Sequence, residues 1–378
     1  MKTKMKIGVD AKWYFDDLPS GRVWTRGITT RFKAAATDQN WTFFFRRSDR
    51  VHSSDVPPCD QAVFASAGWN LLSNVLVLPR HVSSLGLDVL LTNYFAVPAR
   101  VPQVTVVYDI IFESNPELFT RRERAYLSCI KPLLRSASLV VTISEQSRLQ
   151  LARFGYLGRG QECVVVPPGI DQRFLEPIPA TDISRVRDRY ALPARFVLYV
   201  GRLNTRKNVG KLIAAMAKIK DRSVQLVLAG RAEGATEDYA ALAAHLGLAD
   251  RVQFLGSVPD EDLASLYASS AALAYLSEHE GFGLPVVEAM GVGVPVVAAE
   301  TPVGREVYGD VPFYVAISDI GEIARTLDDV LAEPHGLGPR LTIGQHRAGT
   351  YTWDRTTASL IDVLVAQGAR SPRPGGAH

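Results

Sequence analysis

Short runs of apolar, β-branched residues alternate along the chain with longer segments whose apolar positions recur at helical spacing. In the second half this pattern predicts strands at 196–200, 224–229, 252–254, 272–276 and 294–299, helices at 208–219 and 237–248, and a helix that begins at Pro259-Asp-Glu261. The first half predicts strands at 6–9, 41–45, 88–92, 104–107, 139–143 and 163–166. Such alternation is typical of βα units with a parallel sheet covered on both faces, so we expect an α/β fold.

A stretch rich in proline separates two halves of similar length. Pro167-Pro-Gly169 is followed by Glu176-Pro-Ile-Pro-Ala180, which breaks the alternation and is typical of a linker. We place the boundary near residues 172–182, and 378 residues fit two domains of roughly 150 residues each. The expected domains cover 1–175 and 183–345, followed by a last helix over 346–370 and a disordered tail over 371–378. Two doubly wound domains are expected to face each other across a ligand-binding cleft.

The composition excludes several classes of protein. Hydrophobic residues make up 47% and charged residues 21% of the chain, which excludes a disordered or collagen-like protein. The formal net charge of +3 gives no reason to expect a nucleic-acid partner. Three widely spaced cysteines form no disulfide framework. With no secretory signal and no run of 18 apolar residues, we expect a soluble protein of the cytoplasm.

The segment 277–290, with the sequence SEHEGFGLPVVEAM, carries the clearest chemistry. It follows a predicted strand, turns through Gly281 and Gly283, and enters a helix with Pro285 suited to its first position. The backbone N–H groups from Phe282 to Leu284 would lie at the positive end of that helix, where an anion such as a diphosphate binds readily. Glu280 and Glu288 flank this site, and a carboxylate there suits the paired hydroxyls of a sugar or ribose. Alternatively, Glu288 only complements the helix terminus and Glu280 is solvated.

A second polar cluster follows the strand predicted at 196–200. Arg202 and Lys207 lie just beyond the carboxyl end of this strand, where ligands bind in such sheets, and Asn208 could cap the next helix. Two cations there could neutralise a pyrophosphate. A solvated basic loop is the alternative interpretation.

Together these motifs resemble family 4 of the retaining glycosyltransferases, which have the GT-B fold of two Rossmann-like, doubly wound domains. The resemblance covers most of the C-terminal domain and rests on its motifs in order: VGR at 200–202, KN at 207–208, LAG at 228–230, FLGSVP at 254–259, and two glutamates separated by seven residues, Glu280 and Glu288. It extends more loosely into the N-terminal domain through VYD at 107–109, NPE at 115–117, VTIS at 141–144 and VPPGID at 166–171.

The resemblance implies roles for particular residues. Arg202 and Lys207 would bind the donor diphosphate and stabilise the departing nucleotide. Glu280 would contact hydroxyls of the donor sugar and Glu288 the ribose. The further donor-site residues would be the backbone of Phe282, Gly283 and Leu284, the segment of Ser257 and Val258 beside the base, and Gly21 in a loop after the first strand. The last helix, which begins near Trp353, would cross back to the N-terminal, acceptor-binding domain.

One position departs from the family pattern. Many members carry histidine before the aspartate of the N-terminal motif, and this chain has Tyr108 before Asp109. We interpret the change as a difference between subfamilies, which leaves Asp109 as the N-terminal candidate for contact with the sugar or the acceptor. There is no DxD pair suited to a metal, so we expect neither metal nor cofactor.

The expected function is a retaining, metal-independent transfer of a hexose from a nucleotide sugar to a glycan or lipid-linked glycan in polysaccharide biosynthesis. The N-terminal motifs resemble those of bacterial surface-polysaccharide mannosyltransferases, so GDP-mannose is the first donor to consider, before UDP- and dTDP-sugars. A basic segment (Arg121, Arg122, Arg124, Lys131 and Arg135) could rest on the inner surface of a membrane, or could be a solvated helix face. The alternatives are a related GT-B phosphorylase or epimerase, and a non-catalytic subunit that binds nucleotide sugar.

Overall fold

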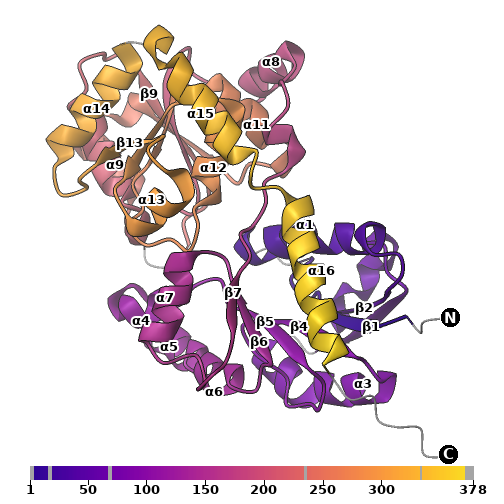
Figure 1. Ribbon diagram of the computed structural model, residues 1–378. Helices are drawn as coiled ribbons and strands as arrows, with labels where there is room; N and C mark the ends of the chain where they lie inside the picture. Colours follow the sequence, from indigo (N-terminus) through magenta and orange to yellow (C-terminus); the bar gives the residue numbers. More distant parts are fainter. Residues whose placement is uncertain (1–3, 16–18, 67–69, 234–235, 333, 371–378) are drawn as a thin grey trace, which may run out of the picture. The chain divides into compact units, whose positions relative to one another are not determined.

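The chain folds into two compact units, which are described separately (Figure 1). The computed structural model describes residues 4–15, 19–66, 70–233, 236–332 and 334–370. Unit 1 contains the chain up to residue 116, residues 120–169 and the chain from residue 352 onward; unit 2 contains residues 117–119 and 170–351. The tail expected over 371–378 lies outside the described residues.

Unit 1 is built on a seven-stranded sheet in the order β3-β2-β1-β4-β5-β6-β7, in which every pair of neighbours is parallel. Its strands are β1 (Lys6–Asp10), β2 (Asn40–Arg46), β3 (Gln61–Ser66), β4 (Val89–Asn93), β5 (Gln103–Val106), β6 (Leu139–Thr142) and β7 (Cys163–Val165). Its helices are α1 (Pro19–Ala35), α2 (Asn70–Leu72), α3 (Leu78–Leu85), α4 (Ile111–Ser114), α5 (Arg121–Leu127), α6 (Ile130–Leu134), α7 (Glu145–Arg153) and α16 (Trp353–Ala369). Residues Ser73–Val77 form a π-helical turn between α2 and α3.

The last helix of the chain completes unit 1. Helix α16 packs along α1 and lies on β4 and β5, as Figure 1 shows for α16 and β4. Trp353, which begins α16, is buried against the ring of Trp24, with 5.9 Å between the ring centroids. A Cβ atom at Gly27 would overlap the indole of Trp353, so a glycine at this position lets α1 and α16 approach closely.

Unit 2 contains a six-stranded parallel sheet in the order β10-β9-β8-β11-β12-β13. Its strands are β8 (Phe196–Val200), β9 (Gln225–Ala229), β10 (Val252–Gly256), β11 (Ala272–Tyr275), β12 (Val296–Ala299) and β13 (Phe313–Val315). From β8 the chain builds outward to β10, and it then returns to place β11 on the other side of β8. The pair β8 and β11 is therefore the topological switch point, where doubly wound sheets bind ligands.

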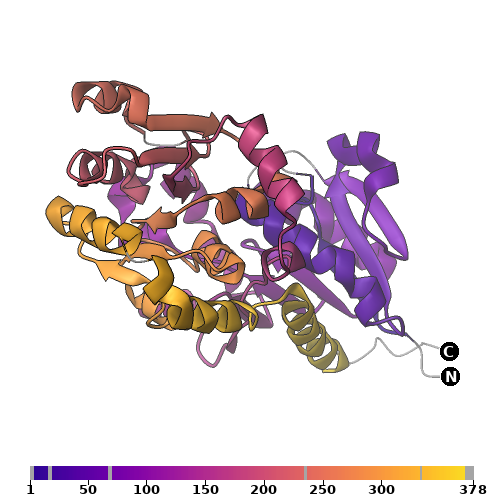
Figure 2. The same cartoon turned by 90° about the horizontal axis from the view of Figure 1, so that it is seen from above.

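The helices of unit 2 form two groups, one on each face of the sheet (Figures 1 and 2). They are α8 (Ala180–Arg189), α9 (Val209–Met216), α10 (Tyr239–His245), α11 (Asp260–Ser269), α12 (Leu284–Val292), α13 (Pro302–Tyr308), α14 (Ile320–Ala332) and α15 (Gly338–Ala348). Helix α9 contacts α10 and α14, whereas α11 contacts α8 and α12, and α12 contacts α15. Unit 2 also has 3₁₀ turns at Gln172–Phe174, Thr205–Lys207, Ala249–Arg251 and Pro334–Leu337. A 3₁₀ segment at Arg47–Asp55 belongs to unit 1, and one at Pro116–Leu118 crosses from unit 1 into unit 2.

The predicted fold class of two Rossmann-like α/β domains is confirmed by these sheets. The strand predictions missed β3 and β13, each of which lies at an edge of its sheet. Strand β13 has only three residues, but both strands contain apolar runs, 62–65 in β3 and 313–315 in β13, so the pattern itself does not account for the omission. In the part of the chain that the structure describes, no helix is both long and apolar enough to cross a membrane.

Asp262 joins helices α8 and α11 of unit 2. Its fully buried carboxylate accepts hydrogen bonds from Arg185 at 2.8 Å, Arg189 at 2.9 Å and the hydroxyl of Tyr190 at 2.8 Å. Burial opposes ionisation, but the hydrogen bonds from Tyr190 and Arg185 and the arginine charges outweigh it and lower the pKa of Asp262. The carboxylate is thus held charged between the two helices.

We expect Asp262→Asn to lower the free energy of unfolding at pH 7 by about 1–3 kcal/mol, because an amide is a weaker acceptor for two arginines and one hydroxyl. Urea unfolding checks this value. Asp182→Asn is the matched control, since Asp182 is half exposed and lies 4.0 Å from Arg185; it should change stability by less than about 0.5 kcal/mol. Equal stability of the two variants would show that the buried carboxylate does not hold α8 to α11.

Candidate donor site of unit 2

The predicted donor-site residues of the C-terminal domain gather at the carboxyl ends of two adjacent strands. Strand β8 leads into the loop of Arg202 and the 3₁₀ turn that ends at Lys207, and β11 leads into the loop that contains Glu280. Asn208 ties the two loops together, because its side-chain amide donates to the carbonyl of Leu276 at 2.8 Å. Both loops therefore lie at the switch point of the sheet.

Asn208 does not have the role predicted for it. Its φ is +54°, in the left-handed region, and its side chain makes no capping hydrogen bond to α9. The amide faces the loop after β11 instead. Asparagine tolerates the left-handed region better than most residues, which suits the sharp turn between the 3₁₀ turn and α9.

Lys207 and Glu280 form a buried ion pair at the centre of the site. The ammonium group of Lys207 donates to Oε1 of Glu280, and only 8% of the lysine side chain and 15% of the glutamate side chain are exposed. The hydroxyl of Tyr275 joins both residues: it accepts from Lys207 at 3.1 Å and donates to Glu280 Oε1 at 2.8 Å. The ammonium group also lies 5.3 Å from the centroid of the Tyr275 ring, within cation–π range.

The surroundings keep this pair ionised at neutral pH. Burial lowers the pKa of Lys207 to about 8, and the charge of Glu280 opposes this shift. Burial opposes ionisation of Glu280, but the charges of Lys207 and Arg206 and the hydrogen bond from Lys207 together lower its pKa to about 2. The site therefore presents a charged lysine and a charged carboxylate at pH 7.

Arg206 is a site residue that the sequence analysis missed. Its guanidinium donates to the backbone carbonyl of His279, so Arg206 and Lys207 both bind the loop after β11. Arg202 is half exposed, and its guanidinium lies 3.6 Å from the carboxylate of Glu233. The two predicted cations and Arg206 thus belong to one short segment, of which Lys207 is the most buried member.

The amino terminus of α12 has the geometry that the sequence predicted, with Gly283 at the N-cap and proline in the first turn. Gly283 has φ +86°, and a Cβ atom there would overlap the hydroxyl of Tyr308. That hydroxyl donates to the carbonyl of Phe282 at 2.8 Å. No side chain caps α12 within the described residues, so the backbone alone forms this terminus. The Phe282 ring is buried against Tyr351, with 5.1 Å between centroids.

Glu288 lies just past the first turn of α12. Helix α12 begins at Leu284, so Glu288 is its fifth residue and falls outside the first turn. Its carboxylate accepts a hydrogen bond from the buried hydroxyl of Tyr267 at 2.9 Å. Burial raises the pKa of Glu288 to about 7; the bond from Tyr267 opposes the shift, and the charges of Asp171 and Asp260 add to it. A carboxylate at this depth cannot serve chiefly to complement the helix terminus.

Ser257 and Val258 follow β10, the edge strand two positions from β8. They lie at the same edge of the sheet as Lys207 and Glu280, because all the strands are parallel. The loops after β8 and β9, which lie between these residues and Glu280, approach each other closely. A Cβ atom at Gly230, after β9, would overlap the carbonyl of Gly201, after β8. Ser257 is exposed and Val258 is partly buried.

The predicted site residues of the N-terminal half lie in unit 1. Gly21 was expected in a loop, but it is the third residue of α1, and its Cα faces the indole of Trp13 so closely that a Cβ atom would overlap it. Asp109 follows β5 and accepts a hydrogen bond from the backbone of Ile111 at 3.3 Å. Tyr108 is buried, and its hydroxyl donates to Asn93 Oδ1 at 2.8 Å. The residue that stands in place of the frequent histidine is therefore part of the core of unit 1.

The basic segment lies on α5 and α6. Arg121, Arg122, Arg124 and Arg135 are exposed. Lys131 is not available to a surface in the same way, because its ammonium group donates to the carbonyl of Phe154 at 2.6 Å and lies over the ring of Tyr156.

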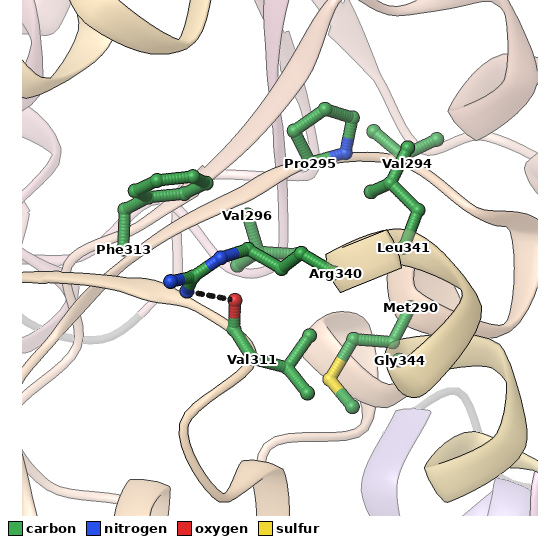
Figure 3. Close-up of a pocket in the computed structure, with 9 residues that line it drawn as sticks. All are labelled: Met290, Val294, Pro295, Val296, Val311, Phe313, Arg340, Leu341 and Gly344. Atoms are coloured by element: carbon green, nitrogen blue, oxygen red, sulfur yellow. Dashed lines mark hydrogen bonds between the residues drawn. The ribbon is translucent and has the colours of Figure 1, made fainter. Parts of the chain in front are cut away.

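A small cavity of about 10 Å³ lies elsewhere in unit 2 (Figure 3). Its lining includes Val294 and Pro295, just before β12, and Val311, just before β13; Arg340 donates to the carbonyl of Val311 at 2.9 Å. The cavity thus lies at the amino ends of the strands, opposite the edge that carries Lys207. It has room for about one water molecule and none for a nucleotide. Among the described residues no cluster of three or more His, Cys, Asp or Glu side chains could hold a metal ion.

Comparison with known proteins places this site in a family. Residues 183–345 match the family model described as glycosyl transferases group 1. The chain is 29% identical to the O-antigen chain mannosyltransferase B of Escherichia coli over 276 residues. This alignment covers 71% of each chain. It is 30% identical to the MMP alpha-(1->4)-mannosyltransferase of Mycolicibacterium hassiacum over 257 residues. This alignment covers 66% of this chain and 59% of that protein.

The fold agrees with this assignment. The Anabaena protein HepE, solved in complex with UDP and glucose, has a TM-score of 0.73 at 21% identity, over 96% of this chain and 100% of that chain. Like the fold of this neighbour, the fold of the chain is the GT-B fold, with one parallel, Rossmann-like sheet in each of its two units. Sequence match and fold together identify residues 183–345, most of unit 2, as a domain of the group 1 glycosyltransferase family.

Proposed function

We propose that this protein is a retaining hexosyltransferase that moves a sugar from a nucleotide donor to a glycan or lipid-linked glycan without a metal ion. The buried Lys207–Glu280 pair at the switch point of unit 2, beside the uncapped amino terminus of α12, carries the proposal. It supplies a cation for the donor diphosphate and a carboxylate for the hydroxyls of the donor sugar. Mannose from GDP-mannose is the first donor to test, because two relatives are named as mannosyltransferases. The UDP complex of the Anabaena neighbour makes UDP-sugars the second.

Stabilisation of the leaving group is the main catalytic contribution in this proposal. When the bond between the sugar C1 and the diphosphate oxygen breaks, negative charge grows on the nucleoside diphosphate. Lys207, Arg202 and the N–H groups at the start of α12 would supply the positive charges and dipoles that stabilise this negative charge. Retention of configuration requires the acceptor hydroxyl to attack C1 on the face from which the nucleotide leaves, and its proton passes to the departing diphosphate oxygen on that face. Glu280 would hold the sugar ring in place during this exchange.

The ion pair has a consequence for donor binding. Lys207 is held by Glu280 before a donor arrives, so a diphosphate must share or replace this partner. The lysine is thereby kept in one position instead of moving freely, which reduces the entropy lost on binding. Glu288, partly protonated near neutral pH, would accept hydrogen bonds from the ribose once ionised.

Thermal unfolding with GDP, UDP, dTDP and ADP tests the proposal. At equal concentrations we expect GDP to stabilise the protein most; a nucleotide present at 100 times its dissociation constant adds about 2.7 kcal/mol, enough to raise the melting temperature by several degrees. GDP-mannose should stabilise it further if Glu280 contacts the sugar. Cooperative unfolding that none of the four nucleotides shifts would contradict the donor site.

A further inference from the structure

Four tyrosines lie beneath the donor site, and each hydroxyl donates to a different part of it. They are Tyr199 on β8, Tyr267 on α11, Tyr275 at the end of β11 and Tyr308 at the end of α13. At most 3% of each is exposed. We propose that these four residues, here called the site tyrosines, are positioning residues that hold the donor site in its binding geometry; this inference rests on the proposed function.

Two of the site tyrosines donate hydrogen bonds to backbone carbonyls. The hydroxyl of Tyr199 donates to the carbonyl of Arg202 at 2.7 Å and so fixes the loop after β8. The hydroxyl of Tyr308 donates to the carbonyl of Phe282 at 2.8 Å and occupies the space that a side chain at position 283 would fill. These bonds set the path of the two loops that would face the diphosphate.

The other two hold the carboxylates. Tyr275 donates to Glu280 at 2.8 Å and Tyr267 donates to Glu288 at 2.9 Å. A carboxylate has several rotamers, and one hydrogen bond from a rigid, buried ring selects among them. Each of the two glutamates, which would bind the sugar and the ribose, thus accepts a hydrogen bond from a different tyrosine.

The distribution of hydroxyls argues against simple core packing. Phenylalanine would fill the same volume without burying a polar group, and a buried hydroxyl lowers stability unless it is hydrogen-bonded. Four rings from four separate elements nevertheless direct their hydroxyls to Arg202, Phe282, Glu280 and Glu288. The rings of Tyr199 and Tyr275 also lie nearly parallel, at 17° with centroids 6.4 Å apart, so the strands that lead into the two loops are in side-chain contact.

Unit 2 offers a matched control. Tyr314 donates to the carbonyl of Gly309 at 2.7 Å, the same kind of bond as that of Tyr199 or Tyr308, but outside the donor site. Tyr314→Phe therefore removes the same kind of hydrogen bond from a ring that is only partly buried, and it should lower stability no more than Tyr308→Phe does. Any difference in ligand binding or turnover between the two must come from the site.

The experiment compares five variants (Tyr199→Phe, Tyr267→Phe, Tyr275→Phe, Tyr308→Phe and Tyr314→Phe) with the wild-type enzyme. It measures melting temperature, the dissociation constants of GDP, UDP and the corresponding sugar nucleotides, and the donor KM and kcat. We expect Tyr267→Phe to weaken binding of the nucleoside diphosphate about tenfold, through Glu288. Tyr275→Phe should lower kcat/KM for the sugar nucleotide about tenfold, through Glu280, and should weaken binding of the nucleoside diphosphate less, because there only the 3.1 Å hydrogen bond from Lys207 is lost.

Tyr199→Phe and Tyr308→Phe should weaken the binding of the nucleotide and of the sugar nucleotide to the same extent. Tyr314→Phe should bind both ligands as tightly as the wild-type enzyme does. The inference is overturned when the wild-type enzyme binds GDP or UDP and the four site variants behave as Tyr314→Phe does. The inference would also be overturned if, in all five variants, the loss of affinity and turnover were proportional to the fall in melting temperature. When the wild-type enzyme binds none of GDP, UDP, dTDP and ADP, the proposed function itself fails, and the inference fails with it.

Discussion

Lys207→Ala is expected to lower kcat for sugar transfer by about 100- to 1000-fold, the usual loss when one preorganised charge facing a developing anion is removed. Lys207 is the most buried cation of the site, with 8% of its side chain exposed, so solvent cannot replace it efficiently. The donor KM should rise less than kcat falls, because the charge on the diphosphate grows as the bond to the sugar breaks. Steady-state kinetics with the donor identified by thermal unfolding measures both constants.

Two controls separate this effect from a general loss of structure. Removal of Lys207 leaves the buried Glu280 without its main partner, so the melting temperature should fall, and the assay temperature must lie well below it. Lys218→Ala removes an exposed lysine just after α9 and should leave kcat unchanged. Turnover of the folded Lys207→Ala variant within about threefold of the wild-type rate would refute leaving-group stabilisation by this residue.

The central residues of the site could be predicted because the ends of buried strands are readable from sequence. Lys207 and Glu280 each follow an apolar run, and ligands bind at the carboxyl ends of such strands. The pairing of β8 with β11 depends on long-range sheet order. The sequence therefore predicted which two loops carry the candidate site, and the ion pair between them emerged only from the structure.

The errors have physical causes of a different kind. Pro19-Ser-Gly21-Arg was interpreted as a loop because proline, serine and glycine favour turns, yet proline is also well placed in a first helical turn. Packing of α1 against α16 favours the helix. Tyr199 reads as one more apolar position within Phe196-Val-Leu-Tyr-Val200, since nothing in the pattern tells where its hydroxyl points. Only the position of Tyr199 and Tyr275 near the carboxyl ends of their strands could have drawn attention to them.

Glu288→Gln is expected to stabilise the protein at pH 8.5 while weakening nucleotide binding. In the folded protein the pKa of Glu288 is raised to about 7, against an ordinary value of 4.5. Below pH 4.5 the carboxyl is protonated in both the folded and the unfolded chain, and it costs no stability. As pH rises from 4.5 to 7 the unfolded chain loses this proton first, so ionisation increasingly favours unfolding, and above pH 7 the whole cost is present.

Because glutamine cannot ionise, the variant escapes this cost and can still accept the hydrogen bond from Tyr267. We expect its free energy of unfolding to exceed that of the wild-type protein by about 1–3 kcal/mol at pH 8.5, and by clearly less at pH 5.5. Binding of the nucleoside diphosphate should weaken about tenfold, since an amide accepts ribose hydroxyls less strongly than a carboxylate does. Urea unfolding at the two pH values and calorimetric titration with nucleotide measure these quantities. A stabilising substitution that costs affinity is the sign of a residue placed for ligand binding at the expense of the fold, whereas a less stable variant with unchanged affinity would make Glu288 a structural partner of Tyr267 alone.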